Sequence, residues 1–297
     1  VWLALAPVVL MLPRISSSGP EAFRSASVDW LLACVCGAIS LTVSVWIGMQ
    51  IGDLPPAYHD EFSYLFQAKT LLAGRFSFPS PAVRPELFDQ MHVLNEGRMA
   101  SRYYPGTGLW LAPFVAIGHP YWGPWLAGAI ASIMTYWTGR ELGGRIAGVV
   151  AGLLMALSPG VGLFGNTLLA HRPTLLGLSI FLLGITRMQR TGSGADALVA
   201  GAGLSFAMLC RPMTAAGFGL PFGIDVVLRL IRGPLTTYDK SDSSLHEEQG
   251  LFRSSRRAIL FCLGAPLVCG WGVMLLYNRD ITGEWFQSPY QVYTEIY

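Results

Sequence analysis

Two neighbouring carboxylates, Asp60 and Glu61, are the residues of this sequence best suited to acid–base chemistry. A carboxylate beside a hydroxyl group can accept its proton while the oxygen attacks another centre. Acidic residues are also common in the first turn of a helix, where they cap backbone N–H groups and meet the positive end of the helix dipole. His59 precedes the pair, and Tyr64 follows it one turn later. The pair is therefore either a proton acceptor or a helix start.

Three arginines of interest each lie within three residues of a proline. Arg211 separates two short apolar stretches, Arg102 opens the segment RYYPG, and Arg172 follows His171. An arginine at membrane depth is costly unless it is paired or faces water, and an anionic lipid phosphate would supply a partner. The alternative for Arg211 is a side chain that snorkels to the surface from a helix end. His171 and Arg172 either contact the same substrates or form an interfacial pair.

The composition places these residues in a membrane protein. The chain has 297 residues, of which 52% are hydrophobic and 13% charged, with a mean hydropathy of +0.46. Soluble domains carry about 25% charged residues. The formal net charge of +2 and the lack of a basic stripe argue against nucleic acid as a partner. We expect an all-α polytopic membrane protein with the lipid bilayer around it.

Seven apolar stretches predict membrane-spanning helices, at residues 31–51, 121–138, 146–164, 168–186, 197–210, 213–228 and 258–277. If the spans alternate, the loops rich in Lys and Arg all fall on one side, which the positive-inside rule makes cytoplasmic. Residues 231–257 then form a cytoplasmic loop, and residues 52–120 form a long first outer loop. Residues 1–30 are expected to end an earlier helix, and residues 31–297 to form one transmembrane module truncated at its C-terminus.

The outer loop is expected to carry interfacial helices. Phe62, Leu65, Phe66 and Leu72 recur at helical spacing after the acidic pair, and Gly74 supplies a stop. This pattern predicts an amphipathic helix. Residues 106–118 are too short to span and predict a second short helix that either lies at the outer interface or dips part-way into the membrane.

Several short motifs follow the acidic pair in a fixed order. Tyr64, Ala68, Leu72 and Gly74 form Y-x3-A-x3-L-x-G, and the RYYPG segment and Arg211-Pro212 come later. In this order the sequence resembles the GT-C superfamily of polyprenyl-phosphate-dependent glycosyltransferases, in particular the branch of protein O-mannosyltransferases and the lipid A aminoarabinose transferase, over residues 31–297. The resemblance implies inverting transfer of a sugar from a polyprenyl-phosphate donor to a glycan, lipid or protein acceptor outside the cytoplasm.

The resemblance also implies roles for the candidate residues. Asp60 would be the catalytic base or would position the acceptor, Glu61 beside it would be the second catalytic residue, and Arg211 would bind the donor phosphate. Tyr104 stands where relatives often carry Lys, so Arg102 would supply the cation of that loop. His171 and Arg172 stand where many relatives carry a second acid, and Arg172 would be a further contact to the phosphate. The residues expected to line the substrate cavity are His59, Tyr64, Tyr104 and His171.

Other classes of function remain open on the sequence. A transporter or lipid flippase would place charges along a membrane path, and a catalytically silent subunit of a glycan-assembly complex would share the motifs without the activity. We expect no cofactor and no metal site, because His59, His92 and His119 have no paired spacing, although a divalent metal is not excluded. The compact loops favour a bacterial inner membrane.

Overall fold

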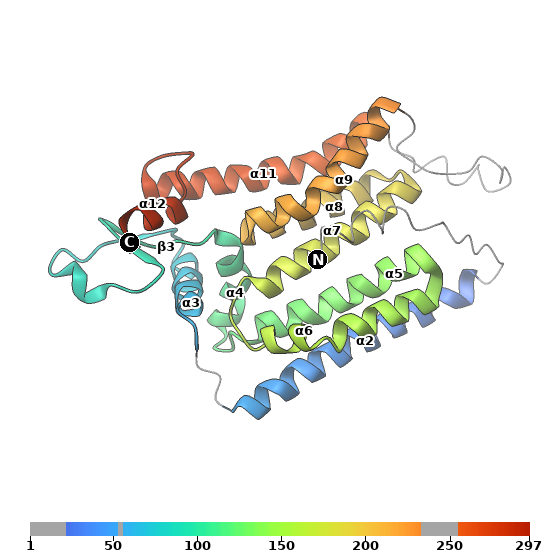
Figure 1. Cartoon of the computed structure of the whole chain (residues 1–297), viewed down its shortest axis with the longest axis horizontal. Coiled ribbons are helices and arrows are strands. Elements are labelled where there is room, and N and C mark those ends of the chain that lie inside the picture. The colour runs from blue at the N-terminus through green and yellow to red at the C-terminus, as the bar shows by residue number, and fades with distance from the viewer. Residues whose placement is uncertain (1–21, 53–55, 233–254) are drawn as a thin grey trace.

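The computed structural model describes residues 22–52, 56–232 and 255–297, and most of them are helical (Figure 1). The elements are α2 (Ala22–Ile51), α3 (His59–Leu72), β1 (Phe78–Pro79), the 3₁₀ helix η1 (Pro85–Phe88), β2 (Val93–Asn95), β3 (Arg98–Ser101), α4 (Pro105–Ala116), α5 (Trp122–Ala156), α6 (Pro159–Phe164), α7 (His171–Thr191), α8 (Gly194–Cys210), α9 (Pro212–Arg232), α11 (Arg256–Thr282) and α12 (Pro289–Ile296). The expected segment 1–30 lies mostly outside the described residues, as does most of the loop 231–257.

The seven apolar stretches all lie on helices, which confirms the helical class of the fold. Among the described helices, Ala26–Ile51 and Arg256–Thr282 are long and apolar enough to cross a membrane. Membrane crossing by these two helices and by the other five stretches stays a prediction. The first helix also begins earlier than expected, at Ala22 and not at residue 31.

The stretches 121–138 and 146–164 form a helical hairpin within α5. The chain turns at Gly143 (φ −143°) and Gly144 (φ +79°). The positive φ of Gly144 is a conformation that glycine adopts without steric cost. The two arms are in close contact, because a Cβ atom on Gly148 would lie 2.8 Å from the Tyr136 carbonyl oxygen. The second arm ends at Ala156, ahead of Pro159, and not at residue 164 as expected. Proline disfavours a helical conformation in the residue before it.

Buried Asp29 holds this hairpin against α2. Its carboxylate lies 2.7 Å from Nη2 of Arg140 and 2.8 Å from Nε of Arg145, and it accepts a hydrogen bond from the Tyr136 hydroxyl group at 3.0 Å. The side chain of Asp29 is fully buried. An unpaired charge there would be costly, so the two arginines at the turn compensate it.

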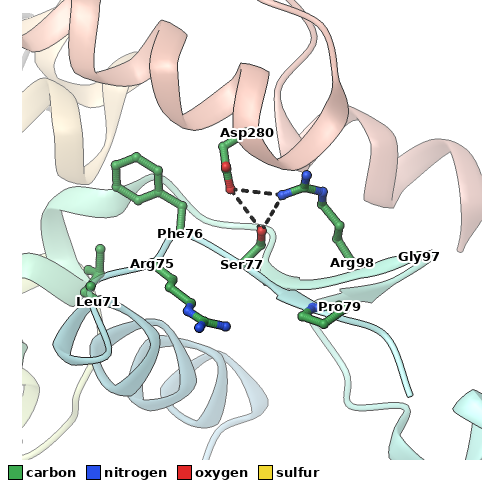
Figure 2. Close-up of a pocket in the computed structure, with 9 residues that line it drawn as sticks. Leu71, Arg75, Phe76, Ser77, Pro79, Gly97, Arg98 and Asp280 are labelled. Carbon is green, nitrogen blue, oxygen red and sulfur yellow. Dashed lines mark hydrogen bonds and ion pairs between the residues drawn. The ribbon is translucent and has the colours of Figure 1, made fainter. Parts of the chain in front are cut away.

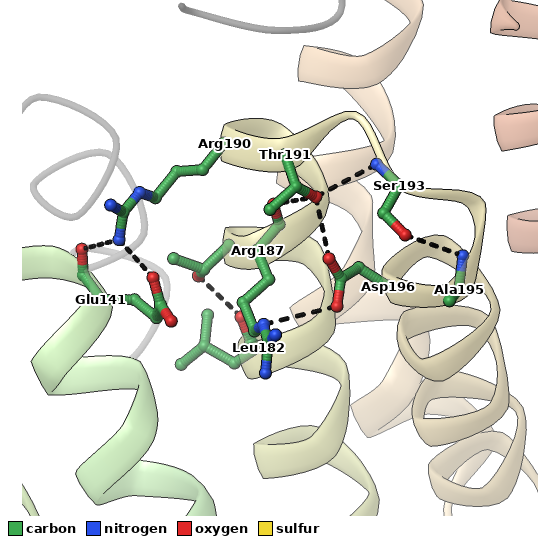
Figure 3. A network of polar contacts seen from close by, with 9 residues as sticks. Glu141, Leu182, Arg187, Arg190, Thr191, Ser193, Ala195 and Asp196 are labelled. Carbon is green, nitrogen blue, oxygen red and sulfur yellow. Dashed lines mark hydrogen bonds and ion pairs between the residues drawn. The ribbon is translucent and has the colours of Figure 1, made fainter. Parts of the chain in front are cut away.

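A second charge network joins α5, α7 and α8 at the same end of the helices (Figure 3). Arg190 pairs with Glu141, and Nε of Arg187 lies 3.4 Å from Asp196. The Thr191 hydroxyl group also donates to Asp196, at 2.8 Å. These acids neutralise part of the basic charge, but the positive-inside rule counts Lys and Arg alone. The predicted orientation is therefore unchanged.

Residues 52–120, the predicted outer loop, contain the two expected helices, α3 and α4, and also a small sheet that was not expected. The strand order is β1-β3-β2, antiparallel, with Phe78 opposite Met99 and Leu94 opposite Ala100. Leu94 and Ala100 pack against Tyr277 near the end of α11. The sheet is an addition to the helices predicted for this segment. Together, α3, the sheet and α12 lie at one end of the long helices (Figure 1).

Gln67 of α3 ties this end of the molecule together. Its amide nitrogen donates to the Tyr103 carbonyl oxygen at 2.8 Å and to the Tyr277 hydroxyl group at 2.9 Å. Its amide oxygen accepts from the backbone N–H of Gly108 at 3.1 Å. Gln67 is 2% exposed, so these bonds form away from water and fix α3 relative to α4 and α11.

Candidate functional site

The first turn of α3 separates the two acids into different environments. Tyr58 is the N-cap residue, Asp60 the second helical residue and Glu61 the third. Glu61 is 1% exposed, and its Oε1 accepts from the N–H groups of Ala57 (3.1 Å) and Tyr58 (3.2 Å). Its Oε2 accepts from the N–H of Leu168, ahead of α7, at 2.7 Å. We therefore assign Glu61 a structural role, in place of the catalytic one suggested by the sequence.

Replacing Glu61 by glutamine should lower the stability of the protein. The amide keeps one acceptor oxygen and turns an NH2 donor toward backbone N–H groups that already lack another partner. A buried donor left unsatisfied costs about 1 to 3 kcal/mol. We expect a lower melting temperature for Glu61→Gln and an unchanged one for Glu284→Gln, an exposed acid after α11. Equal melting temperatures for the two variants would contradict this role.

Asp60 is the accessible member of the pair. Its side chain is 41% exposed, and its Oδ1 lies 3.0 Å from Nε2 of His92. The Tyr103 hydroxyl group hydrogen-bonds to the same carboxylate, and burial together with that bond raises the pKa of Tyr103, so the phenol stays protonated and donates. Asp60 lies in the first turn of α3 but is not its N-cap residue, so the expectation that it caps the helix is wrong. It is a partly exposed carboxylate held by neighbouring side chains.

The hydrogen bonds of His92 define its protonation. Nδ1 lies 3.3 Å from Nη1 of Arg102, and a guanidinium group can only donate. Nδ1 is therefore the acceptor, and the ring proton is on Nε2, which donates to Asp60. Burial lowers the pKa of His92 from its usual 6.5, Arg102 and His59 lower it further, and Asp60 opposes them. At neutral pH, His92 is the neutral tautomer that orients the Asp60 carboxylate.

The backbone of His92 has an unusual conformation that its neighbours maintain. Its φ is +66°, which costs a residue other than glycine about 1 to 3 kcal/mol. The His92 carbonyl oxygen accepts from the Ser63 hydroxyl group at 2.7 Å and from the N–H of Arg102 at 3.1 Å. Its N–H donates to the Tyr293 hydroxyl group at 3.0 Å. Strained residues of this kind gather at functional sites.

Arg102 is enclosed by aromatic rings. Its Cζ lies 4.1 Å from the ring centre of Tyr290, 4.7 Å from that of Tyr293 and 5.4 Å from that of Tyr103. Cation–π attraction to these rings directs the guanidinium toward His92. The expected contact of Arg102 with a donor phosphate is therefore replaced by a positioning role. Tyr290 and Tyr293 come from α12 and were not predicted as site residues.

Arg211 remains the best candidate for a phosphate contact. It follows α8, its side chain is exposed, and within the described ranges it forms no ion pair. The charges of Arg211 and Asp60 both act on Tyr64 and on His171, which places the four residues in one neighbourhood. The structure thus brings together an accessible carboxylate and a cation that the sequence separates by 150 positions.

The remaining candidates lie around this group. His59 is the exposed first residue of α3, and its charge acts on His92. Tyr64 is buried and stacks on Tyr103 with ring centres 4.6 Å apart. Tyr104 is the half-buried N-cap residue of α4. His171 is exposed at the start of α7 and stacks on Phe164.

Arg172 does not join this group. Its side chain is 1% exposed, and Nη2 donates to the Ser44 hydroxyl group of α2 at 3.0 Å. Two glycines leave room for it, because a Cβ atom on Gly128 would lie 1.7 Å from Nη1 and one on Gly165 would lie 2.2 Å from Nη2. Nε and Nη1 have no hydrogen-bond partner among the described residues. The expected contact of Arg172 with a phosphate near Asp60 is corrected to a buried position between helices.

The described residues contain no group of three His, Cys, Asp or Glu side chains that could hold a metal ion. His92 instead pairs with Asp60, and His119 stacks on Trp122 with ring centres 4.7 Å apart. Comparisons with family models and with curated proteins gave no match for this chain. The features that indicate the class of this protein are its apolar helices and the residues around Asp60.

Proposed function

We propose that this protein is a membrane glycosyltransferase that moves a sugar from a polyprenyl-phosphate donor to an acceptor on the extracytoplasmic face of a bacterial inner membrane. The observation that carries the proposal is the environment of Asp60, an accessible carboxylate oriented by neutral His92 and by Tyr103. Arg211, a cation with no ion-pair partner in the described ranges, lies in the same neighbourhood. The order of motifs along the chain supports the same class.

The reaction follows from these two groups. The acceptor hydroxyl group gives its proton to Asp60 while its oxygen forms a bond to C1 of the donor sugar. The bond between C1 and the phosphate oxygen breaks, and the electron pair leaves with the polyprenyl phosphate. Arg211 stabilises the negative charge that grows on that phosphate.

His92 is a positioning residue in this account, and its replacement should lower the rate. Asparagine adopts positive φ more readily than most residues, so His92→Asn preserves the backbone while removing the bonds to Asp60 and Arg102. A hydrogen bond to a charged group contributes about 1.5 to 3 kcal/mol, so we expect transfer to fall about 10- to 100-fold. Donor binding should stay near that of the wild type, and a matching loss of binding would contradict the role.

The lowered pKa of His92 also predicts a pH dependence. The folded state favours the neutral form of His92. The contribution of His92 to the free energy of unfolding is therefore present above pH 6.5, and it is lost as the pH falls through the lowered pKa of the folded state. Activity should fall in the same range, because a protonated Nδ1 can no longer accept from Arg102. His92→Asn should remove this step from the acid limb of the rate profile, and an unchanged acid limb would contradict the assignment.

The site must lie outside the cytoplasm for this function, which a labelling experiment tests. We propose seven spans with residues 52–120 outside. In a chain whose five native cysteines are replaced, Val83→Cys should react with an impermeant thiol reagent in intact cells. Leu142→Cys, at the α5 turn, should react only after lysis. Both side chains are exposed in the folded protein. The reverse pattern would contradict the orientation.

A radiolabelled polyprenyl-phosphate sugar distinguishes transfer from the other two functions. The full-length protein is reconstituted into vesicles with this donor and a mixture of acceptors. Glycosyl transfer moves the label off the polyprenyl phosphate. Movement of the intact labelled lipid to the other leaflet would instead identify a flippase, and no movement of label in the complete system would favour a silent subunit.

A further inference from the structure

A cavity of about 770 Å³ lies at the far end of α3 from Asp60, and the proposed reaction does not use it (Figure 2). Its wall includes the C-terminal turn of α3 at Leu71, the segment that leads into β1, the start of β3 at Arg98, and Asp280 near the end of α11. Leu71 lies 11 residues after Asp60, so the cavity and Asp60 are about 16 Å apart along the helix.

The polar wall of this cavity has an excess of positive charge. It contains two cations, Arg75 and Arg98, and one anion, Asp280. The Ser77 hydroxyl group donates to Oδ2 of Asp280 at 2.9 Å and accepts from Nη1 of Arg98 at 3.0 Å. Nη1 of Arg98 also lies 3.4 Å from the same carboxylate oxygen. Asp280 is thus occupied by Ser77 and Arg98, as Figure 2 shows.

Arg75 is left without a carboxylate among the described residues. Its guanidinium carbon lies 5.6 Å from the ring centre of Phe78, and its side chain is exposed and stands apart from the Asp280 group (Figure 2). A guanidinium group binds phosphate and carboxylate through paired N–H donors. Arg75 therefore carries the uncompensated charge of the cavity and is also its best anion-binding group.

The apolar part of the wall favours a saccharide over a free ion. Phe76, Pro79 and Leu71 line the same cavity as the arginines. Ligand pockets typically combine such apolar surface with a few oriented polar groups, whereas an inorganic anion would use the polar groups alone. The volume of the cavity also exceeds what a single phosphate fills.

The segment from Arg98, the first residue of β3, to Arg102, just past the end of β3, leads from the cavity toward His92 and Asp60. Ala100, between the two arginines, is fully buried. Arg98 meets Asp280 of α11, and Arg102 meets Tyr290 and Tyr293 of α12. From Arg98 to Arg102 the chain covers about 13 Å. An extended oligosaccharide covers this distance, whereas a monosaccharide does not.

We propose that this cavity binds an anionic group, a phosphate or carboxylate, on an oligosaccharide acceptor whose reactive hydroxyl group reaches Asp60. The inference rests on the proposed function for the identity of that oligosaccharide as the acceptor. Binding of the anionic oligosaccharide in the cavity needs only Arg75, Arg98 and the apolar wall. This binding can therefore be measured without the polyprenyl-phosphate donor.

Binding to the full-length protein in detergent, measured by titration calorimetry at low salt, tests the inference. The probes are chitotriose with a phosphate on its terminal sugar, chitotriose and inorganic phosphate. The phosphorylated trisaccharide should bind at least about tenfold more tightly than either other probe, since one charge-assisted hydrogen bond gives about that factor. If unphosphorylated chitotriose binds as tightly as the phosphorylated trisaccharide, the cavity does not recognise an anion. If inorganic phosphate binds as tightly, the cavity does not recognise the saccharide.

Three variants locate the site. Arg75→Gln should weaken binding of the phosphorylated trisaccharide about tenfold, with the melting temperature unchanged because the side chain is exposed. Arg84→Gln removes the same charge from the same loop outside the cavity and should bind like the wild type. Asp280→Asn removes the only anion of the wall and should strengthen binding. Weaker binding by Asp280→Asn, or equal binding by the two arginine variants, would overturn the inference.

The binding and transfer experiments can fail separately. Binding that depends on Arg75, in a protein that transfers no sugar, would overturn the proposed function and leave the anion site in place. Sugar transfer by a protein whose cavity binds none of the three probes would overturn the anion site and leave the proposed function.

Discussion

Asp60→Asn is expected to lower the rate of sugar transfer by about 10² to 10⁴, the usual effect of losing a general base. The amide of asparagine has the shape of the carboxylate but cannot accept the acceptor's proton. Thermal stability should stay near that of the wild type, because Glu61 and not Asp60 satisfies the N–H groups at the start of α3. The measurement is the initial rate at saturating donor.

Asp89→Asn is the matched control for this variant. Asp89 lies in the same outer loop, and its carboxylate accepts from the Asn95 side chain at 2.8 Å, a bond that the asparagine oxygen can also accept. Its rate should equal that of the wild type. If Asp60→Asn keeps most of its activity, the assignment of Asp60 as proton acceptor is wrong.

Arg211→Ala should weaken binding of the polyprenyl-phosphate donor about 10- to 100-fold. A hydrogen bond between ions contributes about 1.5 to 3 kcal/mol, and a nearby membrane strengthens it by lowering the dielectric constant. Arg211→Lys should keep part of the affinity, because the charge remains while the paired geometry of the guanidinium is lost. Donor binding can be followed by equilibrium titration with a fluorescent polyprenyl phosphate.

Arg279→Ala controls for loss of an exposed arginine at the same end of the molecule. Arg279 lies near the end of α11, with its guanidinium carbon 5.9 Å from the ring centre of Trp285. Donor binding by this variant should match the wild type. If Arg211→Ala also binds the donor normally, Arg211 is a snorkelling side chain at a helix end.

The helices of the outer loop were predictable because their signals are local. Apolar residues recur every three or four positions in α3, and Gly74, with φ of +69°, follows its end as expected. The sheet was not predictable in the same way. Its strands have two to four residues, too few for an alternating pattern to be recognised.

Part of the site was also visible in the sequence. Asp60 and Arg211 were singled out from their types and flanking residues, and the structure places both near His171 and Tyr64. The role of Glu61 is hard to assign from the sequence, because a capping carboxylate and a catalytic one look alike when they are adjacent. Only the structure shows that its second oxygen binds the N–H of Leu168.

The residues around Asp60 could not be inferred, because their contacts are distant along the chain. His92 was considered only as a metal ligand, and its partner Asp60 lies 32 positions earlier. Two of the three tyrosines around Arg102, Tyr290 and Tyr293, come from α12, about 190 positions away. Contacts of this kind depend on how α12 and the outer loop pack together, which has no local signature in the sequence.

The central claim is that Asp60 accepts the proton of the acceptor in a single displacement at C1 of the sugar. The anomeric configuration of the product, read by NMR from a donor of known configuration, tests it most directly. A single displacement predicts inversion at C1, since the acceptor oxygen attacks opposite the departing phosphate. Retention of configuration would exclude a single displacement from the face opposite the phosphate and would contradict the account.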